Sequence, residues 1–452
     1  MAALAALATA ILEVPEEIHA KETQVEGPLV PPVPETLEDT GLASAVIEQL
    51  LFKLLYYRGE MMGRDIAKAV GVKFSLIEEL LETAKRQHQI QTKKSLGMGN
   101  QSSIFSLSEA GRTLAREFLE NNQYTGPAPV PLYQYNYIVR RQRRKEGWLT
   151  PAALDHAYRH AVTTPRMLAQ IGPAVSSGNS FLIYGQAGNG KTYMAEALAG
   201  IDDDSIYVPY AIESQGSIIQ VFDPIYHQPI HSEEEPLSAF RSEEVHDGRW
   251  VKCKRPFIVT GGELSPDMLD LTFNNVSKIY DAPYQLKANN GIYLLDDFGR
   301  QRCTPAEILN RWIVPMERRV DYLSFRTGGK MTVPFEAFLI FSTNLRPTDL
   351  GDDAFLRRIQ YKMLVRNPDV DEFVRIFLRF CESRELTCDS QTVRNFVDRH
   401  YRTSGKAMRR CQPRDVLSHA IHLVQFEGLP MQLTDEVLDR AFESCFTEDV
   451  ED

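Results

Sequence analysis

The chain has 452 residues, of which 43% are hydrophobic and 25% charged, and its formal net charge at pH 7 is −11. This length predicts two to four domains, and the composition is ordinary for a soluble globular protein. The negative charge gives no global attraction to nucleic acid or to an anionic membrane, although a local basic surface could still provide one. The six cysteines are scattered and form no Cys-x-x-Cys pair, which favours reduced thiols over a disulfide framework or a zinc site.

The start of the chain does not resemble a secretion signal. Residues 1–14 are rich in Ala and Leu but lack a basic segment, and Glu13, Glu16 and Glu17 follow at once. No apolar stretch approaches the length of a membrane span. We therefore expect a cytoplasmic protein without a membrane partner.

Residues 1–42 contain one basic residue, Lys21, among several acidic residues and five prolines. Such a segment buries too little apolar surface to order itself, which predicts a disordered acidic tail.

Residues 43–122 carry three helical patterns, then two short strands and a last helix. The helices are expected at 43–57, 63–70 and 74–87, and the strands near 89–92 and 103–107. This order, together with the exit sequence Leu107-Ser108-Glu109-Ala110-Gly111-Arg112, resembles bacterial winged helix-turn-helix domains.

The resemblance implies that the third helix could read DNA. That helix carries Glu78, Glu79 and Glu82, whose carboxylates would repel phosphate, whereas the hairpin offers Lys93 and Lys94. The balance favours a protein-docking role for this domain and leaves DNA binding open as an alternative.

Residues 123–149 read as a Pro-rich and basic linker. Gly126–Pro131 predicts a stiff connection, and the densest basic run of the chain follows at Arg140, Arg141, Arg143, Arg144 and Lys145. We expect a solvated helix face at a domain junction, with a nucleic-acid patch as the alternative.

Residues 150–366 alternate apolar strands with helical stretches, which predicts an α/β domain with a doubly wound parallel sheet. The strand candidates are Phe181–Tyr184, Ser205–Pro209, Phe257–Thr260, Ile292–Leu295 and Ala337–Ser342. Residues 367–452 show only helical patterns, at 370–383, 390–401, 413–426 and 434–446, which predicts an all-α lid.

A glycine-rich loop follows the first strand and precedes a helical stretch, and it matches the phosphate-loop pattern G-x-x-x-x-G-K-[ST]. Its glycines let successive N–H groups turn toward an anion, and the following helix adds its positive end. Lys191 would reach the outer phosphates of a nucleoside triphosphate, and Thr192 would hold Mg²⁺ through its hydroxyl. The predicted nucleotide-binding residues are Gly185, Gln186, Ala187, Gly188, Asn189, Gly190, Lys191 and Thr192.

Two later strands end in polar groups. Asp296 and Asp297 close the strand at 292–295, where two carboxylates would repel each other without a cation. Asp296 is predicted to bind Mg²⁺ through water, and Asp297 to orient the attacking water. Asn344 closes the strand at 338–343 and is predicted to hold that water or to sense the terminal phosphate.

Arginines complete the pattern. Arg357 and Arg358 follow Asp352-Asp353-Ala354-Phe355-Leu356, and Arg414 stands at the start of a lid helix. Taken in order, these motifs resemble those of the AAA+ ATPases: Walker A, Walker B, sensor 1, arginine finger and sensor 2, over about residues 150–448. The resemblance implies ATP and Mg²⁺ as cofactors and a ring-shaped homo-oligomer, most often a hexamer. It also implies that Arg357 or Arg358 reaches a neighbouring subunit's γ-phosphate and that Arg414 senses nucleotide.

Residues 319–333 alternate around Thr327-Gly328-Gly329-Lys330, which predicts a β-hairpin. A hairpin at this place resembles the AAA+ clade of the MoxR proteins, magnesium chelatase and the bacterial enhancer-binding activators, in which it lies toward the pore and engages substrate. The chain departs from the family at Asp297, where glutamate is usual, and this predicts slow hydrolysis. Residues 210–255, with Glu233-Glu234-Glu235, His227, His231 and His246, fit no motif and are expected to form a solvated insertion.

These features predict an ATP-hydrolysing remodeller of a protein client. Two alternatives remain: a DNA-directed machine that holds duplex with its winged helix, and an ATP-gated scaffold with little turnover.

Overall fold

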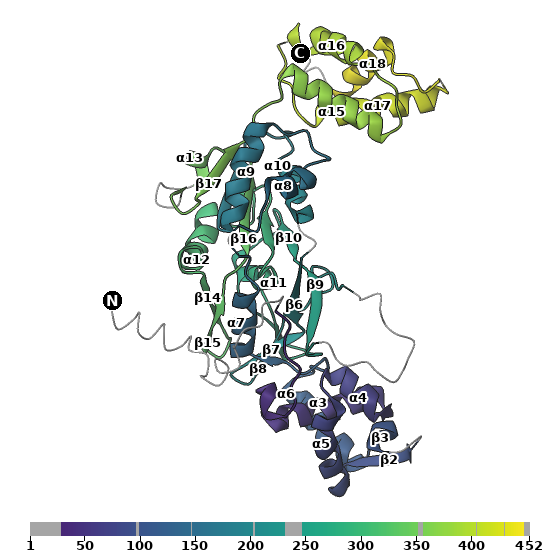
Figure 1. The fold of residues 1–452 in the computed structure, drawn as a ribbon, viewed down its shortest axis with the longest axis vertical. Helices are drawn as coiled ribbons and strands as arrows, with labels where there is room; N and C mark the ends of the chain where they lie inside the picture. The colour runs from purple at the N-terminus through teal and green to yellow at the C-terminus, as the bar shows by residue number, and fades with distance from the viewer. Residues whose placement is uncertain are drawn as a thin grey trace.

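The computed structural model describes residues 29–95, 99–145, 147–201, 204–230, 246–350, 356–403, 405–428 and 430–446. Figure 1 shows an elongated molecule, with an N-terminal helical unit at one end and a C-terminal helical unit at the other. Two five-stranded β-sheets and two two-stranded ribbons lie between these ends. No helix within the described ranges is both long enough and apolar enough to cross a membrane.

The N-terminal unit (residues 44–121) contains its elements in the predicted order. Its strands form a small antiparallel sheet of order β1-β3-β2. Gly71 ends α4 in the left-handed conformation, with φ of 74°, and the Ser108 hydroxyl caps α6 by accepting from the Gly111 N–H. The elements are α3 (Ser44–Arg58), β1 (Met61–Met62), α4 (Gly63–Val70), α5 (Phe74–Arg86), β2 (Ile90–Ser95), η2 (Asn100–Ser102), β3 (Ser103–Leu107) and α6 (Glu109–Asn121).

The predicted disordered tail is wrong for residues 29–42, while residues 1–28 lie outside the described chain. Residues 29–42 include a short 3₁₀ helix, η1 (Glu38–Thr40), and the side chain of Leu42 is buried in the core of the N-terminal unit. The prediction from composition failed because backbone carbonyl groups of this segment form hydrogen bonds with residues far along the chain. The Pro31 carbonyl accepts from the Asp247 N–H, and the Thr40 carbonyl accepts from Arg249.

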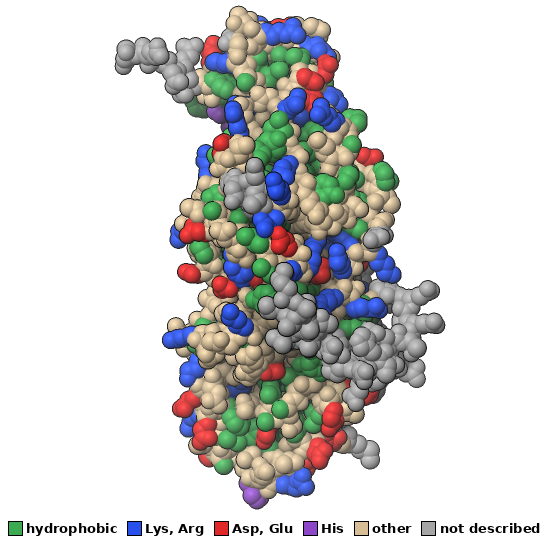
Figure 2. Space-filling view, turned by 90° about the vertical axis from the view of Figure 1, so that its left-hand side faces the viewer, with side chains coloured by type: hydrophobic (Ala, Val, Ile, Leu, Met, Phe, Trp, Pro, Cys, Tyr) green, Lys and Arg blue, Asp and Glu red, His purple; other side chains and the backbone are tan. Residues whose placement is uncertain are grey.

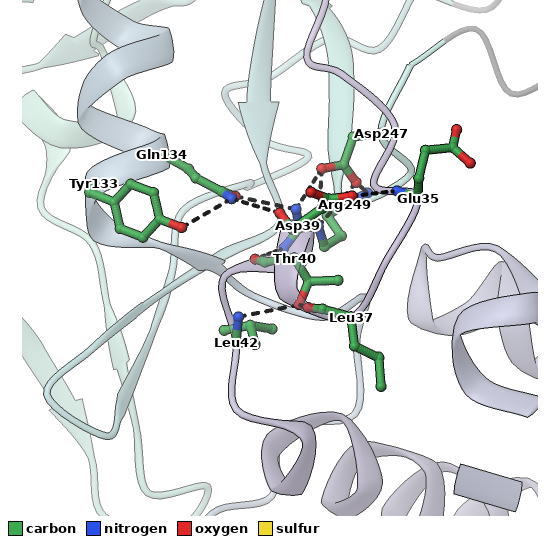
Figure 3. A network of polar contacts seen from close by, with 9 residues as sticks. All are labelled: Glu35, Leu37, Asp39, Thr40, Leu42, Tyr133, Gln134, Asp247 and Arg249. Carbon is green, nitrogen blue, oxygen red and sulfur yellow. Dashed lines mark hydrogen bonds and ion pairs between the residues drawn. The ribbon is translucent and has the colours of Figure 1, made fainter. Parts of the chain in front are cut away.

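A buried polar network holds this segment in place (Figure 3). The side chains of Arg249 and Asp247 are 1% and 3% exposed and form an ion pair of 2.8 Å. The Arg249 guanidinium also donates to the Thr40 carbonyl at 2.8 Å and to Oε1 of Gln134 in α7 (Leu132–Arg141) at 3.2 Å. The network therefore joins residues 38–42, α7 and the segment before β9.

The central sheet confirms the predicted parallel α/β architecture. Five parallel strands run in the order β10-β13-β16-β5-β17. Their near-continuous apolar sequences suit a sheet that is covered on both faces. One face packs against α12, and the other packs against α8, α9 and α10. The strands are β5 (Ser180–Tyr184), β10 (Phe257–Thr260), β13 (Ile292–Leu295), β16 (Phe338–Thr343) and β17 (Tyr361–Leu364), and the helices are α8 (Pro151–Ala157), α9 (Pro165–Ser177), α10 (Lys191–Glu196) and α12 (Pro305–Arg318).

One predicted strand does not join this sheet. Residues Ser205–Pro209 form β6, which pairs antiparallel with β9 (Trp250–Lys254) in a separate ribbon. The fifth parallel strand is instead β17, which the sequence pattern missed because it is short and carries polar Lys362. An apolar run marks a strand but does not choose its partner.

A second sheet of order β11-β12-β8-β7-β4 lies between the parallel sheet and the N-terminal unit. It corrects two expectations. The presumed linker at 123–149 contains β4 and α7, and the α7 side chains of Tyr135, Ile138 and Val139 are buried in the same core as this sheet. The presumed insertion at 210–255 supplies β7 and β8 to it, although residues 231–245, with His231 and the three glutamates, lie outside the described chain. The strands are β4 (Val130–Pro131), β7 (Ala211–Ser214), β8 (Ser217–Gln220), β11 (Thr272–Asn274) and β12 (Ile279–Asp281).

The hairpin expected at 319–333 is formed by β14 (Val320–Ser324) and β15 (Lys330–Pro334). It packs onto the second sheet, with Phe325 and Met331 in the shared core. At its tip, the Arg326 N–H donates to the Tyr280 hydroxyl at 3.1 Å and its guanidinium donates to Asn275 at 2.7 Å. In this chain the two strands of the hairpin therefore form a wall of the second core.

The C-terminal helical unit (residues 369–446) is all helical, as predicted. Asp369, Asp389 and Thr434 cap its helices through their side chains. The helices are α15 (Val370–Ser383), α16 (Ser390–Val397), a π-helical turn η5 (Asp398–Arg402), α17 (Gln412–Glu427) and α18 (Asp435–Cys445). The remaining short helices of the chain are η3 (Ala197–Gly200), η4 (Pro266–Leu269), α11 (Tyr284–Lys287) and α13 (Pro347–Leu350).

Candidate functional site

The glycine-rich loop (residues 185–192) connects the carboxyl end of β5 to α10. Gly188 and Gly190 have φ of 80° and 77°, a left-handed conformation that glycine adopts without strain. At Gly185, a Cβ atom would stand only 2.3 Å from the Val365 carbonyl oxygen. The sequence pattern therefore has a direct steric cause. At Gly185 there is no room for a side chain, and at Gly188 and Gly190 the left-handed backbone disfavours one.

Three neighbouring parallel strands deliver polar side chains to this loop, because their carboxyl ends lie at the same edge of the sheet. The Thr192 hydroxyl donates to both carboxylate oxygens of Asp296 at 3.0 and 2.9 Å. The Lys191 ammonium donates to Oδ1 of Asn344 at 2.6 Å and to the Gln186 carbonyl at 3.1 Å. The structure thus brings together residues that lie up to 153 positions apart.

Asn344 links the lysine to the second carboxylate. Its Oδ1 accepts from Lys191, and its Nδ2 donates to Oδ1 of Asp297 at 3.0 Å. Lysine, amide and carboxylate therefore form one hydrogen-bonded chain across the loop.

Asp297 has a backbone φ of 46°, which is uncommon for a residue with a side chain. The surroundings hold this conformation in place. The next N–H, of Phe298, donates to the Ser342 carbonyl at 2.7 Å, and the Gln301 side chain donates to the Asp296 carbonyl at 2.9 Å. Strained backbone that the fold maintains is a feature of functional sites. Gln301 was missed by the sequence analysis, since no motif marks it.

Charges converge on Lys191. Burial lowers the pKa of its ammonium, the carboxylates of Asp297 and Asp296 raise this pKa, and the nearby guanidinium of Arg409 lowers it. Arg409 belongs to the C-terminal helical unit, so that unit contributes a positive charge to the site.

The structure places Arg409, and not Arg414, against the glycine-rich loop. The Arg409 guanidinium donates to Oε1 of Gln186 and, at 3.1 Å, to Oδ1 of Asn367. Arg414 is exposed on α17 and forms an ion pair of 3.0 Å with its neighbour Asp415. The sequence contains one signal for Arg409, a pair of arginines just before the lid helix. It does not show that the turn before this helix directs the Arg409 side chain toward the glycine-rich loop.

Arg357 and Arg358 lie far from the glycine-rich loop of their own chain. The Ser180 hydroxyl, at the first residue of β5, donates to the Arg358 carbonyl at 3.2 Å. The loop begins at the other end of this strand, about 16 Å away at 3.3 Å per residue. The Arg358 guanidinium pairs with Glu317 of α12 at 2.7 Å, and Arg357 is exposed. The preceding residues 351–355, with Asp352 and Asp353, lie outside the described chain.

The donor set suits magnesium. Thr192 and Asp296 offer a hydroxyl and a carboxylate, the hard oxygen ligands that Mg²⁺ prefers, and the loop amides and Lys191 suit the phosphates that Mg²⁺ usually accompanies. Among the described residues, no group of three or more His, Cys, Asp and Glu side chains is arranged to hold a metal ion by itself.

Comparisons with known proteins give one partial family match and distant structural similarities. A family model described as a domain of unknown function (DUF8689) matches residues 369–444, within the C-terminal helical unit. The search of curated proteins found no match.

Among solved structures, NtrX from Brucella abortus is 12% identical with a TM-score of 0.38, and the match covers 65% of this chain and 57% of NtrX. RuvB from Thermotoga maritima is 11% identical with a TM-score of 0.34, over 67% of this chain and 73% of RuvB. Domain III of the replication initiation protein DnaA from Thermotoga maritima is 12% identical with a TM-score of 0.36, over 66% and 99% of the two chains. These similarities are distant, and the interpretation of the site rests on its own residues.

Proposed function

We propose that this chain is an AAA+-type ATPase that binds ATP with Mg²⁺ at the glycine-rich loop and hydrolyses it. The observation that carries the proposal is the hydrogen-bonded set Lys191–Asn344–Asp297, with Thr192–Asp296 beside it, at the carboxyl ends of β5, β13 and β16. Ligands of open α/β sheets bind in the crevice at this edge.

The roles follow from the chemistry of each group. The loop amides and Lys191 bind the phosphates, and Thr192 with Asp296 holds Mg²⁺, which neutralises charge on the phosphates when bound. Asp297 orients the attacking water, and Asn344 fixes the Asp297 carboxylate by its 3.0 Å hydrogen bond. Since aspartate is one methylene shorter than the usual glutamate, we expect slow turnover.

The arginines divide between two sites. Arg409 takes the role that the sequence assigned to Arg414, because its guanidinium already lies at the loop. Arg357 and Arg358, near the amino end of β5, are too far from the loop of their own chain to act there. They therefore act on a neighbouring subunit, which requires a homo-oligomer, and a closed ring such as a hexamer satisfies this for every site.

The N-terminal unit is proposed to be a winged-helix domain that docks a protein client. The hairpin residue Lys93 is paired with Glu60 at 2.6 Å, and Lys85 of α5 with Glu82 at 3.2 Å. Acidic and basic side chains both occur over this lower end of the molecule in Figure 2. These pairings reduce the positive charge available to DNA phosphates, and for this reason the protein-remodelling function is favoured over the DNA-directed one.

Calorimetry and steady-state hydrolysis test the proposal. Wild type should bind ATP with Mg²⁺, Lys191→Ala should lose binding, and Asp297→Ala should retain binding but lose turnover. Lys68→Ala, an exposed lysine on α4, is the matched control and should behave as wild type. Absence of heat for ATP or ADP with folded wild type would refute the proposal.

The same material separates the alternatives. Binding without turnover above the Asp297→Ala level would favour the ATP-gated scaffold. Binding of random duplex that weakens steeply with salt would favour the DNA-directed machine. For shared sites, a mixture of Lys191→Ala subunits with subunits that lack both Arg357 and Arg358 should recover part of the activity, and no recovery at any ratio would argue for a self-contained site.

A further inference from the structure

The C-terminal helical unit is attached to the glycine-rich loop through Asn189, a loop position that the motif leaves unspecified. Asn189 is only 1% exposed. Its Nδ2 donates to Oδ1 of Asn367 at 2.8 Å, and its Oδ1 accepts from the Arg410 N–H at 3.4 Å. A buried amide without hydrogen-bond partners costs free energy, so the loop is more stable when these two contacts are formed. The side chain of Asn189 therefore docks the C-terminal helical unit through Asn367 and Arg410.

Asn367 connects this docking point to Arg409. It lies between β17 and α15, where the chain leaves the sheet for the helical unit. Its single Oδ1 atom accepts both from Asn189 and, at 3.1 Å, from the Arg409 guanidinium. One amide oxygen thus holds the loop and the arginine together.

The backbone around Arg409 is fixed independently of Asn367. The Arg409 N–H donates to Oε1 of Gln412 at 2.6 Å. The next side chain, Arg410, forms a largely buried ion pair with Glu372 at 3.0 Å and donates to the Val162 carbonyl at 3.0 Å. Loss of Asn367 would therefore release the Arg409 guanidinium without moving its backbone.

The other acceptor of Arg409 is the exposed side chain of Gln186. A neutral amide oxygen is a weaker partner for a guanidinium than a phosphate oxygen, because the bond to phosphate joins opposite charges. Lys191 uses the backbone carbonyl of Gln186 and not its side chain. The Gln186 side chain can therefore give up Arg409 without disturbing Lys191.

Resting on the proposed function, we propose that Asn367 and Asn189 are positioning residues that present Arg409 to nucleotide in the glycine-rich loop, and that the Gln186 side chain competes with nucleotide for this arginine. Binding of a triphosphate exchanges the Gln186–Arg409 bond for a phosphate–Arg409 bond. The position of the C-terminal helical unit over the sheet end (Figure 1) is thereby coupled to the occupancy of the loop.

Four variants test this by calorimetry with a non-hydrolysable ATP analogue and by kcat and KM. Asn367→Leu should raise the dissociation constant and KM about tenfold or more, the value of a hydrogen bond to a charged group, with a smaller change in kcat. Arg409→Ala should do the same. The double variant should show clearly less than the product of the two single effects, because Asn367 holds Arg409 as well as Asn189. Gln186→Ala should tighten binding by about two- to fivefold, since a competing acceptor is removed.

Gln360→Leu is the matched control. It removes an exposed amide at the other end of β17, where Gln360 accepts from Asn179 at 2.7 Å, and it should leave binding unchanged. Provided that wild type binds nucleotide, two results would overturn the inference. One is that the effects of Asn367→Leu and Arg409→Ala on affinity multiply in the double variant. The other is an unchanged affinity in Asn367→Leu or in Gln186→Ala. A wild type that binds no nucleotide would instead defeat the proposed function itself.

Discussion

The buried ion pair between Asp247 and Arg249 allows a quantitative prediction about the junction of the N-terminal unit with the rest of the chain. Asp247→Ala removes a carboxylate that accepts from Nε and Nη2 of Arg249 at 3.0 and 2.8 Å. Among the described residues, the guanidinium then keeps Thr40 and Gln134 as acceptors, and it is only 1% exposed to water. Removal of one partner from such a pair costs about 3–5 kcal/mol, mostly because the other charge stays buried.

This magnitude should appear as local opening of residues 29–42, which the network holds to α7 and to the segment before β9 (Figure 3). At about 1.4 kcal/mol for each factor of ten, 3–5 kcal/mol raises the population of the open state by about two to four orders of magnitude. Hydrogen–deuterium exchange of peptides from this segment in the full chain measures that population directly.

Two further variants make the measurement decisive. Glu60→Ala breaks the Lys93–Glu60 pair, which is as short at 2.6 Å but about half exposed on both sides, and should cost less than about 1 kcal/mol. Asp247→Leu combined with Arg249→Met removes both buried charges and should return exchange close to the wild-type rate. If Asp247→Ala exchanges no faster than Glu60→Ala, or the double variant exchanges as fast as Asp247→Ala, the ion pair is not what holds the segment.

Three other predictions concern single side chains. Burial lowers the pKa of Lys53 from 10.5 to about 8, so the folded state binds its proton less tightly than the unfolded state does. In urea unfolding, the stability of wild type relative to Lys53→Met should therefore rise by about 3 kcal/mol between pH 8 and 10.5, and no such rise should appear relative to Lys68→Met. Gly188→Ala places a Cβ 2.8 Å from the Cys411 sulfur at a φ of 80°, so it should raise KM for ATP about tenfold or more, and a wild-type KM would contradict the close packing. Burial also lowers the pKa of His227 from 6.5, so the unfolded chain takes up a proton below about pH 6.5 that the folded chain does not, and wild type should lose stability there. In thermal unfolding, His227→Gln should lose less stability than wild type as the pH falls. Equal losses of stability in the two proteins would refute this prediction.

Local sequence determined the parts of this protein that depend on consecutive residues. The glycine-rich loop needs glycine where φ is positive and where Val365 leaves no space, so its pattern is legible without the fold. Asp296, Asp297 and Asn344 could be named because they stand just after the ends of buried strands, and parallel strands end at one edge of a sheet. The C-terminal helices were readable for a similar reason, since helical spacing marks a buried face.

The tertiary structure alone decided which partners these elements meet. Arg409 and Arg414 are equivalent in sequence terms, but the turn before α17 aims the first at Gln186 and leaves the second on an exposed face. Residues 29–42 and α7 looked like tail and linker because their order comes from distant partners such as Arg249. The pairing of β6 with β9, and the packing of the hairpin on the second sheet, likewise depend on strands far along the chain. Periodicity records which face of an element is buried, whereas the identity of what covers that face is a long-range property that no local pattern contains.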